Sequence, residues 1–249
     1  MTPELLYPDW PVFPRTHAVM TTRSGGVSQG VYASLNLGDH VADNPEHVAT
    51  NRQRLRDAAG LPADPVWLKQ VHGCEVVEAG QAGCEADAVY TDRPGVVCAV
   101  LTADCLPLLL CDRLGQAVCA VHAGWRGLAA GVIERAVSRF QVPAESLLAW
   151  LGPAIGPAAF EVSDEVRGVF LDVAPGDEGA FQPSKPGHWR ADLYRLARFR
   201  LNRAGVGFIG GGDYCTVTDR ERFFSYRRDG VTGRMASLIW LEDPPSGTS

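Results

Sequence analysis

The sequence lacks an apolar run long enough to cross a membrane. Its longest apolar stretch, residues 96–111, is interrupted by two polar residues and a proline, whereas a spanning helix needs about 20 predominantly apolar residues. The first residues, MTPELLYPDWPVFPRTH, contain acids and prolines but no apolar segment of the kind that a signal peptide requires. We therefore expect a cytoplasmic protein with no membrane partner.

The seven cysteines include no CxxC pair, which excludes a zinc ribbon or a thioredoxin-type redox site. Their number is odd, and several lie in apolar runs such as VVCAV. Disulfide frameworks are typical of short secreted chains, so we expect reduced thiols here. We predict that six cysteines form no disulfide: Cys74, Cys84, Cys98, Cys111, Cys119 and Cys215. The seventh cysteine, Cys105, is a candidate metal ligand.

Positive charge is scarce relative to acid, and lysine is nearly absent. The chain has 2 Lys against 21 Arg, and its formal net charge is −6. This balance excludes a general attraction to nucleic acid or to an anionic membrane, so we expect no nucleic-acid partner. The arginines nevertheless offer planar forks that suit phosphate or carboxylate.

The apolar patterns of the chain predict a mixture of strands and helices without strict βαβ alternation. Period-2 or continuous apolar runs predict strands over residues 17–23, 66–71, 75–77, 96–103, 106–112, 117–122, 147–151, 223–226 and 234–240. Helical periodicity predicts helices over residues 125–140 and 193–204, and capping residues predict helices over 45–59 and 163–171. A loop is expected over 172–190. The pattern indicates an α+β fold, with one domain over residues 1–241 and a flexible tail over 242–249.

Three candidate ligands each follow an apolar run, beside a glycine or near a proline: His72, Cys105 and His122. Side chains at the ends of strands often meet in a cleft on a rigid scaffold. Two imidazoles and one thiolate suit Zn²⁺ or copper, and three protein ligands leave one position open for water or substrate. We therefore expect these residues to converge on one ion.

The residues themselves leave other interpretations open. The spacings of 33 and 17 residues match no short metal motif, and each residue has an ordinary structural role as an alternative, as a turn histidine, a core histidine or a small buried thiol. A second functional hypothesis is a nucleophile pair, with Cys105 attacking and one histidine as the base. Asp104 is a candidate to orient such a histidine or a metal-bound water.

Anion binding is indicated by three further segments. Arg23 precedes the pair Gly25-Gly26, a loop able to bring backbone N–H groups to a phosphate. Arg126 lies at a predicted helix N-terminus, where the helix dipole favours anions. The segment FFSYRR, residues 223–228, mixes aromatic residues with cations. An ordinary turn or an edge hairpin explains the first and last of these segments equally well.

The sequence resembles a known family along nearly its whole length. The stretches that carry the resemblance run in order from about residue 21 to residue 241: TTRSGGVS, ASLNLGDHV, NRQRL, WLKQVHG, DAVYTDRPG, LTADCLPLLL, VHAGWRGLAAG, GPAIGP and FFSYRRDGVTGRMASLIWL. The family is the YfiH-type laccase-domain (multicopper polyphenol oxidase-like) group, whose members are also called purine nucleoside phosphorylases or peptidoglycan editing factors.

The resemblance implies a fold, a site and an activity. The fold is a single domain of two packed mixed β-sheets with helices outside, in α/β/β/α layers. The metal ligands of the family match His72, Cys105 and His122. The implied activity is phosphorolysis of adenosine, inosine and S-methyl-5′-thioadenosine, with adenosine deamination as a side activity. Polyphenol oxidation with copper and hydrolysis by a catalytic cysteine are the other activities that the resemblance suggests.

We expect a purine nucleoside phosphorylase and adenosine deaminase that uses Zn²⁺, with Cu²⁺ as the alternative ion, as a monomer or small homo-oligomer. A multicopper oxidase needs more histidines than the six present, so laccase chemistry ranks last. Motif position and charge indicate five candidate residues for binding purine nucleoside and phosphate: Arg23, Asn36, Arg126, Ser225 and Arg227. A peptidoglycan-precursor amidase or other hydrolase, and a non-catalytic metal-binding protein, remain the alternatives.

Overall fold

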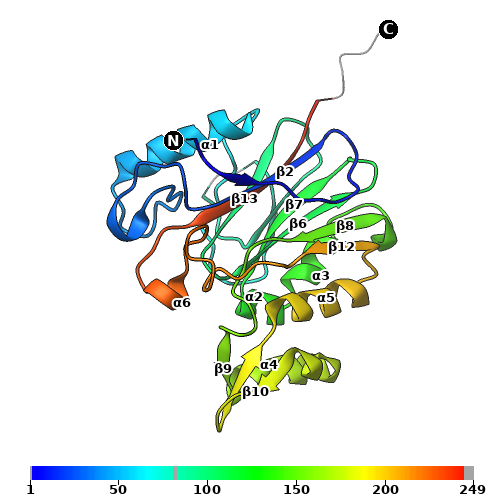
Figure 1. Ribbon diagram of the computed structural model, residues 1–249. Coiled ribbons are helices and arrows are strands. Elements are labelled where there is room, and N and C mark those ends of the chain that lie inside the picture. The colour runs from blue at the N-terminus through cyan, green and yellow to red at the C-terminus, as the bar shows by residue number, and fades with distance from the viewer. Residues whose placement is uncertain (1, 81–82, 244–249) are drawn as a thin grey trace.

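Two β-sheets form the centre of the protein in the computed structural model, which describes residues 2–80 and 83–243 (Figure 1). The larger sheet has six strands in the order β12-β8-β6-β7-β4-β3. In that order the strands are Phe208–Gly211, Leu147–Leu151, Leu106–Asp112, Val118–Ala123, Ala88–Thr91 and Val76–Glu78. β12 pairs with β8, and β3 with β4, in parallel, while the other pairs are antiparallel, so this sheet is mixed.

The smaller sheet has four strands in the order β1-β2-β13-β5. They are Leu5–Leu6, Thr16–Thr21, Met235–Leu241 and Val97–Thr102. All three pairings between them are antiparallel. Apart from 66–71, which forms only isolated bridges at Val66 and Lys69, and 223–226, every strand predicted from the apolar patterns is present within two residues at each end. The short strands β1, β4 and β12 were not predicted.

Alternating side chains of the central strands fill two separate apolar layers, as the pleat of a strand requires. In β5, Cys98 and Val100 are fully buried between the two sheets, in one cluster with Leu109 of β6 and Ile239 of β13. The intervening residue Ala99 belongs to a second cluster on the outer face of the small sheet. The two sheets therefore pack face to face, and the outer face of each sheet needs a cover of helices.

Helices supply that cover on both sides (Figure 1). Helix α1, Pro45–Ala59, places Leu55 against Leu238 of the small sheet. On the large sheet, α2 (Trp125–Ala129), α3 (Val132–Val137) and α5 (Leu193–Arg203) bury apolar side chains against Leu108. The expected single α+β domain with α/β/β/α layers is confirmed.

The predicted helix over 125–140 is two short helices. Helix α2 ends at Ala129 and α3 begins at Val132, because Gly131 between them has a φ of 91°. A glycine adopts this left-handed conformation at little cost, and it breaks the run of helical hydrogen bonds. Both halves keep the predicted apolar stripe facing the sheet, since Leu128 and Ile133 are fully buried.

The loop predicted over 172–190 is wrong. Helix α4 runs over Asp164–Val173, which confirms the helix predicted over 163–171, and a 3₁₀ helix follows over Pro175–Ala180. A small antiparallel sheet then forms from β10 (Phe181–Pro183), β11 (His188–Ala191) and β9 (Glu161–Ser163). Of the prolines and glycines that suggested a loop, Pro175, Gly176 and Gly179 lie in the 3₁₀ helix, Pro183 ends β10, and Pro186 and Gly187 lie in the turn between β10 and β11. This unit projects beyond the large sheet (Figure 1).

The strand predicted at 223–226 is also wrong. Phe223 and Phe224 are fully buried, but they pack in a cluster with Met235 instead of pairing with a strand. Ser225 then caps the short helix α6, Tyr226–Asp229, by accepting a hydrogen bond from the Arg228 N–H. The two phenylalanines are buried by tertiary packing, and their apolar side chains produced a sequence pattern like that of a strand.

The remaining elements are two 3₁₀ turns, Gly30–Tyr32 and Ala144–Ser146. Among the described residues, no helix is long and apolar enough to span a bilayer. Cys74, Cys98, Cys105, Cys111, Cys119 and Cys215 carry free thiols. The predicted tail over 242–249 lies outside the described residues from position 244 onward.

We expect the layer between the sheets to dominate stability. Leu109→Ala should lower the free energy of unfolding by about 2–5 kcal/mol, because it opens a cavity where both sheets meet. Leu114→Ala is the control, since Leu114 is 60% exposed and its loss should change stability by no more than about 0.5 kcal/mol. Urea unfolding followed by circular dichroism measures both. Equal losses in the two variants would contradict this assignment of the core.

Candidate metal and active site

The structure brings His72, Cys105 and His122 together. Their ligand atoms all lie within 4.8 Å of one another. The Sγ atom of Cys105 lies 3.8 Å from Nε2 of His72, and the two imidazole rings meet edge to face at 4.8 Å between centroids. Small side-chain adjustments would bring all three donors to the bond lengths of about 2.0–2.3 Å that zinc requires.

Each ligand comes from a different part of the fold. Cys105 lies where the chain crosses from β5 in the small sheet to β6 in the large one. His122 belongs to β7, whose register with β6 pairs it with Pro107, two residues beyond Cys105. His72 lies in the segment before β3. The cluster therefore depends on the pairing of β6 with β7 and on how the segment before β3 is held.

Gln70 and Asp87 hold that segment against both sheets. The Gln70 amide donates to the carbonyl of Leu101 in β5 and accepts from the same residue's N–H, at 2.8 and 2.7 Å. The Asp87 carboxylate, just before β4, accepts hydrogen bonds from the backbone N–H groups of His72 at 2.9 Å and Gly73 at 2.6 Å. His72 is thus fixed from the small sheet on one side and the large sheet on the other.

Asp87 also orients His122. Its Oδ1 atom accepts from Nδ1 of His122 at 2.7 Å, and both side chains are buried. A histidine that donates Nδ1–H to a carboxylate keeps Nε2 free for a metal, as is usual at metal sites. Sequence reasoning missed Asp87. The available signal was an acid directly before the buried strand AVYT, where a charged residue needs a partner.

Two residues of the site have left-handed backbone conformations, His72 with φ 60° and Asp104 with φ 90°. Such conformations are uncommon outside glycine and are retained where surrounding contacts impose them. The contacts of His72 are those with Asp87. The carboxylate of Asp104 accepts from the Thr216 hydroxyl at 2.5 Å and from the Arg227 N–H at 2.6 Å. Asp104 thereby ties the Cys105 crossing to the segment that begins α6.

Gly124 makes room for the cluster. A Cβ atom at this position would lie 3.0 Å from Sγ of Cys105 and 3.1 Å from Cδ2 of His72. A Cβ at Gly127 would lie 2.4 Å from the carbonyl oxygen of Gly73. The glycines of the HAGWRG segment therefore allow α2 to pack directly on the ligands and on the turn that follows His72.

The charges of the cluster support each other. Burial alone would raise the pKa of the Cys105 thiol, but the charge of His122 and hydrogen bonds with both histidines lower it to about 6. Burial would lower the pKa of His122, whereas the Cys105 thiolate and Asp87 raise it to about 9. Burial also tends to raise the pKa of Asp87, yet its bonds to His122 and to backbone N–H groups lower it overall. Without a metal, Cys105 and His122 therefore form a thiolate–imidazolium pair near neutral pH, and a metal that binds them takes the place of the proton on His122.

Two cavities of different character meet at Cys105. One of about 450 Å³ contains all three ligands and is otherwise lined by His40, Gln70, Leu101, Thr102, Ala103, Tyr226 and Arg234. The other, of about 130 Å³, is mainly apolar and is lined by Ala103, Asp104, Cys105, Trp125, Ile155, Phe160, Leu193, Tyr226 and Arg227. The exposed ring of Tyr226 borders both. A substrate at the cluster therefore has a polar region on one side and an apolar region on the other.

Three predicted substrate residues have structural contacts. The Asn36 amide is buried, donates to the Gly38 carbonyl and to Asp43, and accepts from the N–H groups of Gly38 and Arg234. The buried Ser225 hydroxyl caps α6. Arg227 borders the apolar cavity, stacks on Phe160 and donates to the carbonyl of Glu161. Their roles in substrate binding stay predictions.

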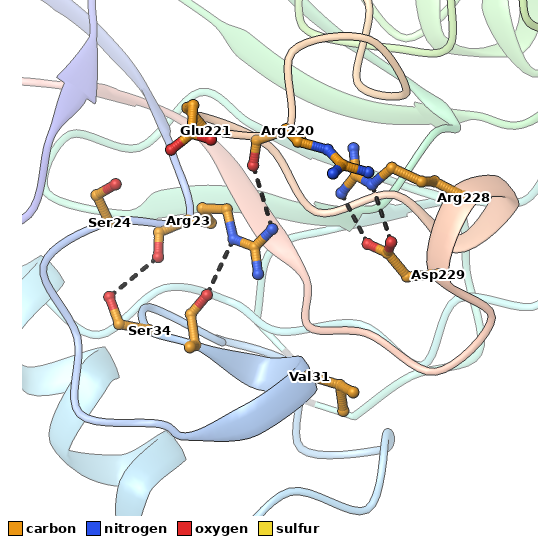
Figure 2. Close-up of a pocket in the computed structure, with 9 residues that line it drawn as sticks. Arg23, Ser24, Val31, Ser34, Arg220, Glu221, Arg228 and Asp229 are labelled. Atoms are coloured by element: carbon orange, nitrogen blue, oxygen red, sulfur yellow. Dashed lines mark hydrogen bonds and ion pairs between the residues drawn. The ribbon is translucent and has the colours of Figure 1, made fainter.

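Arg126 and Arg23 lie elsewhere. Arg126 is exposed, stacks on Trp125 and lines neither cavity at the cluster. Arg23 lines a separate cavity of about 650 Å³ together with Arg220 and Arg228 (Figure 2). There its guanidinium donates to the carbonyl oxygens of Ala33 and Arg220. The structure thus does not bring Arg23 into the cavity that holds the ligands.

Comparison with known proteins identifies the family. Residues 17–242 match the family described as multi-copper polyphenol oxidoreductase laccase. The chain belongs to this laccase-domain family. A Pseudomonas aeruginosa relative named purine nucleoside phosphorylase is 55% identical over 240 residues, which cover 96% of this chain and 98% of that protein. Purine nucleoside phosphorylase YfiH of Escherichia coli is 55% identical over 241 residues, with 96% and 99% covered.

Solved structures of the laccase-domain family share the fold. A Neisseria meningitidis protein of the DUF152 family superposes with a TM-score of 0.92 at 51% identity and covers 96% of this chain and 99% of its own. YlmD from Geobacillus stearothermophilus superposes with a TM-score of 0.91 at 32% identity, with 96% of each chain covered. The resemblance stated from sequence motifs is therefore confirmed at the level of family and fold.

Asp87→Asn should lower zinc affinity by about 10- to 100-fold, the usual effect of losing a partner behind a metal-bound histidine. Asparagine places an NH₂ group against either the Gly73 N–H or the Nδ1–H of His122. Competition with a chromophoric chelator measures the affinity. Glu75→Gln is the control, because the Glu75 side chain is 63% exposed and, within the described part of the chain, its carboxylate pairs with Arg135 alone. An Asp87→Asn variant that binds zinc like the control would exclude the positioning role.

In metal-free protein, iodoacetamide at pH 7 should alkylate Cys105 before the buried Cys98, Cys111 and Cys119, whose pKa values are raised by burial. The rate should fall as the pH drops through about 6, because the thiolate of Cys105 then becomes protonated. Zinc should protect this thiol and leave the partly buried Cys215 unaffected. Peptide mapping by mass spectrometry measures each site. Alkylation at Cys105 that is independent of both pH and zinc would contradict the electrostatics described above.

Proposed function

We propose that the protein is a purine nucleoside phosphorylase. It cleaves adenosine, inosine and S-methyl-5′-thioadenosine with inorganic phosphate and deaminates adenosine as a side activity, at a metal site formed by His72, Cys105 and His122. The observation that carries the proposal is the convergence of these three donors at the meeting point of a polar and an apolar cavity. The names of the relatives point to the same activity.

The donor set fits Zn²⁺, with Cu²⁺ as the alternative. Two imidazoles and a thiolate are borderline-soft ligands, and three protein donors leave one coordination position for water or substrate. The two histidines lower the pKa of the Cys105 thiol to about 6, and a deprotonated thiol is the form that binds metal. A buried carboxylate holds His122, as carboxylates commonly hold metal-binding histidines. When bound, such an ion supplies Lewis acidity that polarises an oxygen or lowers the pKa of a bound water.

The protein's own residues would position the substrate around this centre. The apolar cavity beside Trp125, Ile155 and Phe160 suits a purine ring or a methylthio group, because it offers mostly carbon surface. Tyr226 lies between the two cavities, where its exposed ring is placed to stack on a base. The polar cavity then takes the ribose and the phosphate. Asp104 stabilises this arrangement through Thr216 and the N-terminus of α6.

A cysteine hydrolase is the second candidate, because the Cys105 thiolate lies beside two histidines as a nucleophile pair requires. It differs from the first in the fate of the sugar. Phosphorolysis joins phosphate to the sugar, whereas hydrolysis releases the free sugar or, on an amide substrate, an acid and an amine.

We expect turnover of adenosine and inosine to require phosphate and to yield ribose 1-phosphate. Cys105→Ala should lower both bound metal and this activity, by more than the about 10- to 100-fold that follows the loss of an outer-shell partner. Chromatography of products with and without phosphate, and metal analysis of the same samples, test this. Free ribose formed at equal rates without phosphate would favour the hydrolase. Full activity in a metal-free variant would show the ion to be incidental.

A further inference from the structure

One arginine outside the predicted set lines the cavity that holds the three ligands. Arg234 precedes β13 and is only partly accessible. Its Nη1 atom donates to the carbonyl oxygens of Thr232 and Gly233, both at 3.0 Å. Among the residues that the structure describes, none accepts a hydrogen bond from its Nε or Nη2 atom, and none forms an ion pair with it. One side of the guanidinium, the Nε–Nη2 edge, is therefore free to bind an anion.

The guanidinium is held in place before any ligand binds. Two carbonyls fix Nη1, and the Arg234 backbone N–H donates to Oδ1 of the buried Asn36 at 2.9 Å. The side chain lies directly over Gly38, where an added Cβ would be 2.8 Å from Cγ of Arg234. A preorganised fork loses little conformational entropy when it binds a planar or tetrahedral anion. Asn36 and Gly38 thus act through Arg234.

Among the described residues, no carboxylate forms an ion pair with Arg234. Burial lowers the pKa of its guanidinium, and the charges of Cys105 and Asp104 are the strongest influences that raise it. The group stays protonated, since arginine keeps its proton at all ordinary pH values. When the Cys105 thiolate binds a metal cation, the cation neutralises its negative charge, so the thiolate no longer compensates the charge of Arg234. The partly buried guanidinium beside the metal centre is then stabilised by binding an anion from solution.

The other arginines near the cluster have fewer free donors or lie in another cavity. Arg228 bonds three carbonyls and pairs with Asp229. Arg227 donates to the Glu161 carbonyl and borders the apolar cavity. Arg23 lies in the separate cavity of Figure 2. Arg234 alone, among the described arginines, is part of the cavity lining that includes His72, Cys105 and His122.

We propose that the free Nε–Nη2 edge of Arg234 binds inorganic phosphate beside the His/Cys/His cluster. This assignment rests on the proposed function. In the reaction, an oxygen of hydrogen phosphate bonds to C1′ of the ribose and the C1′–N9 bond breaks with its electron pair on N9. The proton of the phosphate passes to the purine, so ribose 1-phosphate and free base result. The role of Arg234 is to hold the phosphate and to neutralise its charge, and it forms no covalent bond.

Arg234→Lys tests the fork, because lysine keeps the charge but loses the bidentate contact. We expect the KM for phosphate to rise by about 10-fold or more, the effect of losing one charge-assisted hydrogen bond. The KM for inosine should change less than about 3-fold. The matched control is Arg135→Lys on the exposed side of α3, which should leave both values unchanged. Melting curves of all variants identify any loss of folding.

Arg23→Lys decides between the two candidate anion sites. If Arg23→Lys raises the KM for phosphate and Arg234→Lys does not, the assignment to Arg234 is overturned. Equal increases in the KM values for phosphate and inosine, or a lowered melting temperature with unchanged kinetics, would also overturn it, because they indicate a structural role.

A direct binding measurement separates this assignment from the proposed function. Line broadening of inorganic phosphate in ³¹P NMR, with the protein as purified, reports binding without turnover. Broadening by the unmodified protein that is lost in Arg234→Lys supports the phosphate site, even if no nucleoside is cleaved and the phosphorylase assignment fails. Absence of broadening with the unmodified protein, or broadening that persists in Arg234→Lys, overturns the site.

Discussion

The buried carboxylate of Asp87 is the interaction on which the site depends. It receives the Nδ1–H of His122 and the backbone N–H groups of His72 and Gly73, so one side chain fixes two of the three ligands. A buried carboxylate is costly to desolvate and is stable only when its oxygens are fully bonded. The same requirement that keeps Asp87 stable therefore determines where both imidazoles lie.

The third ligand is positioned by the architecture of the two sheets. Cys105 lies in the short crossing between β5 and β6, and Asp104 beside it bonds to Thr216 and to the start of α6. This crossing places Cys105 beside His72 and His122, with an apolar cavity on one side and a polar cavity on the other. A centre placed between two such surfaces can address different parts of one substrate at once.

Much of the fold was predictable because its strands are long and regular. The apolar runs of β5, β6, β7, β8 and β13 and the capped start of α1 were located within two residues. The failures occurred where local signals compete with packing. Gly131 divides an otherwise continuous helical stripe, Phe223 and Phe224 are buried without forming a strand, and a proline-rich stretch folds into β10 and β11.

The sequence by itself determined the chemistry available at the site: two histidines and a cysteine at strand ends, with glycines that permit close packing. Which groups act on one another was decided only by the tertiary structure. Asp87, Gln70 and Arg234 reach the cluster through pairings between segments far apart in the chain, and spacing carries no information about those pairings. Likewise, the tertiary structure decides which cavity an arginine enters and which carbonyls take up its donors, and this separates Arg234 from Arg23 in another cavity and from Arg228 with its bonded donors.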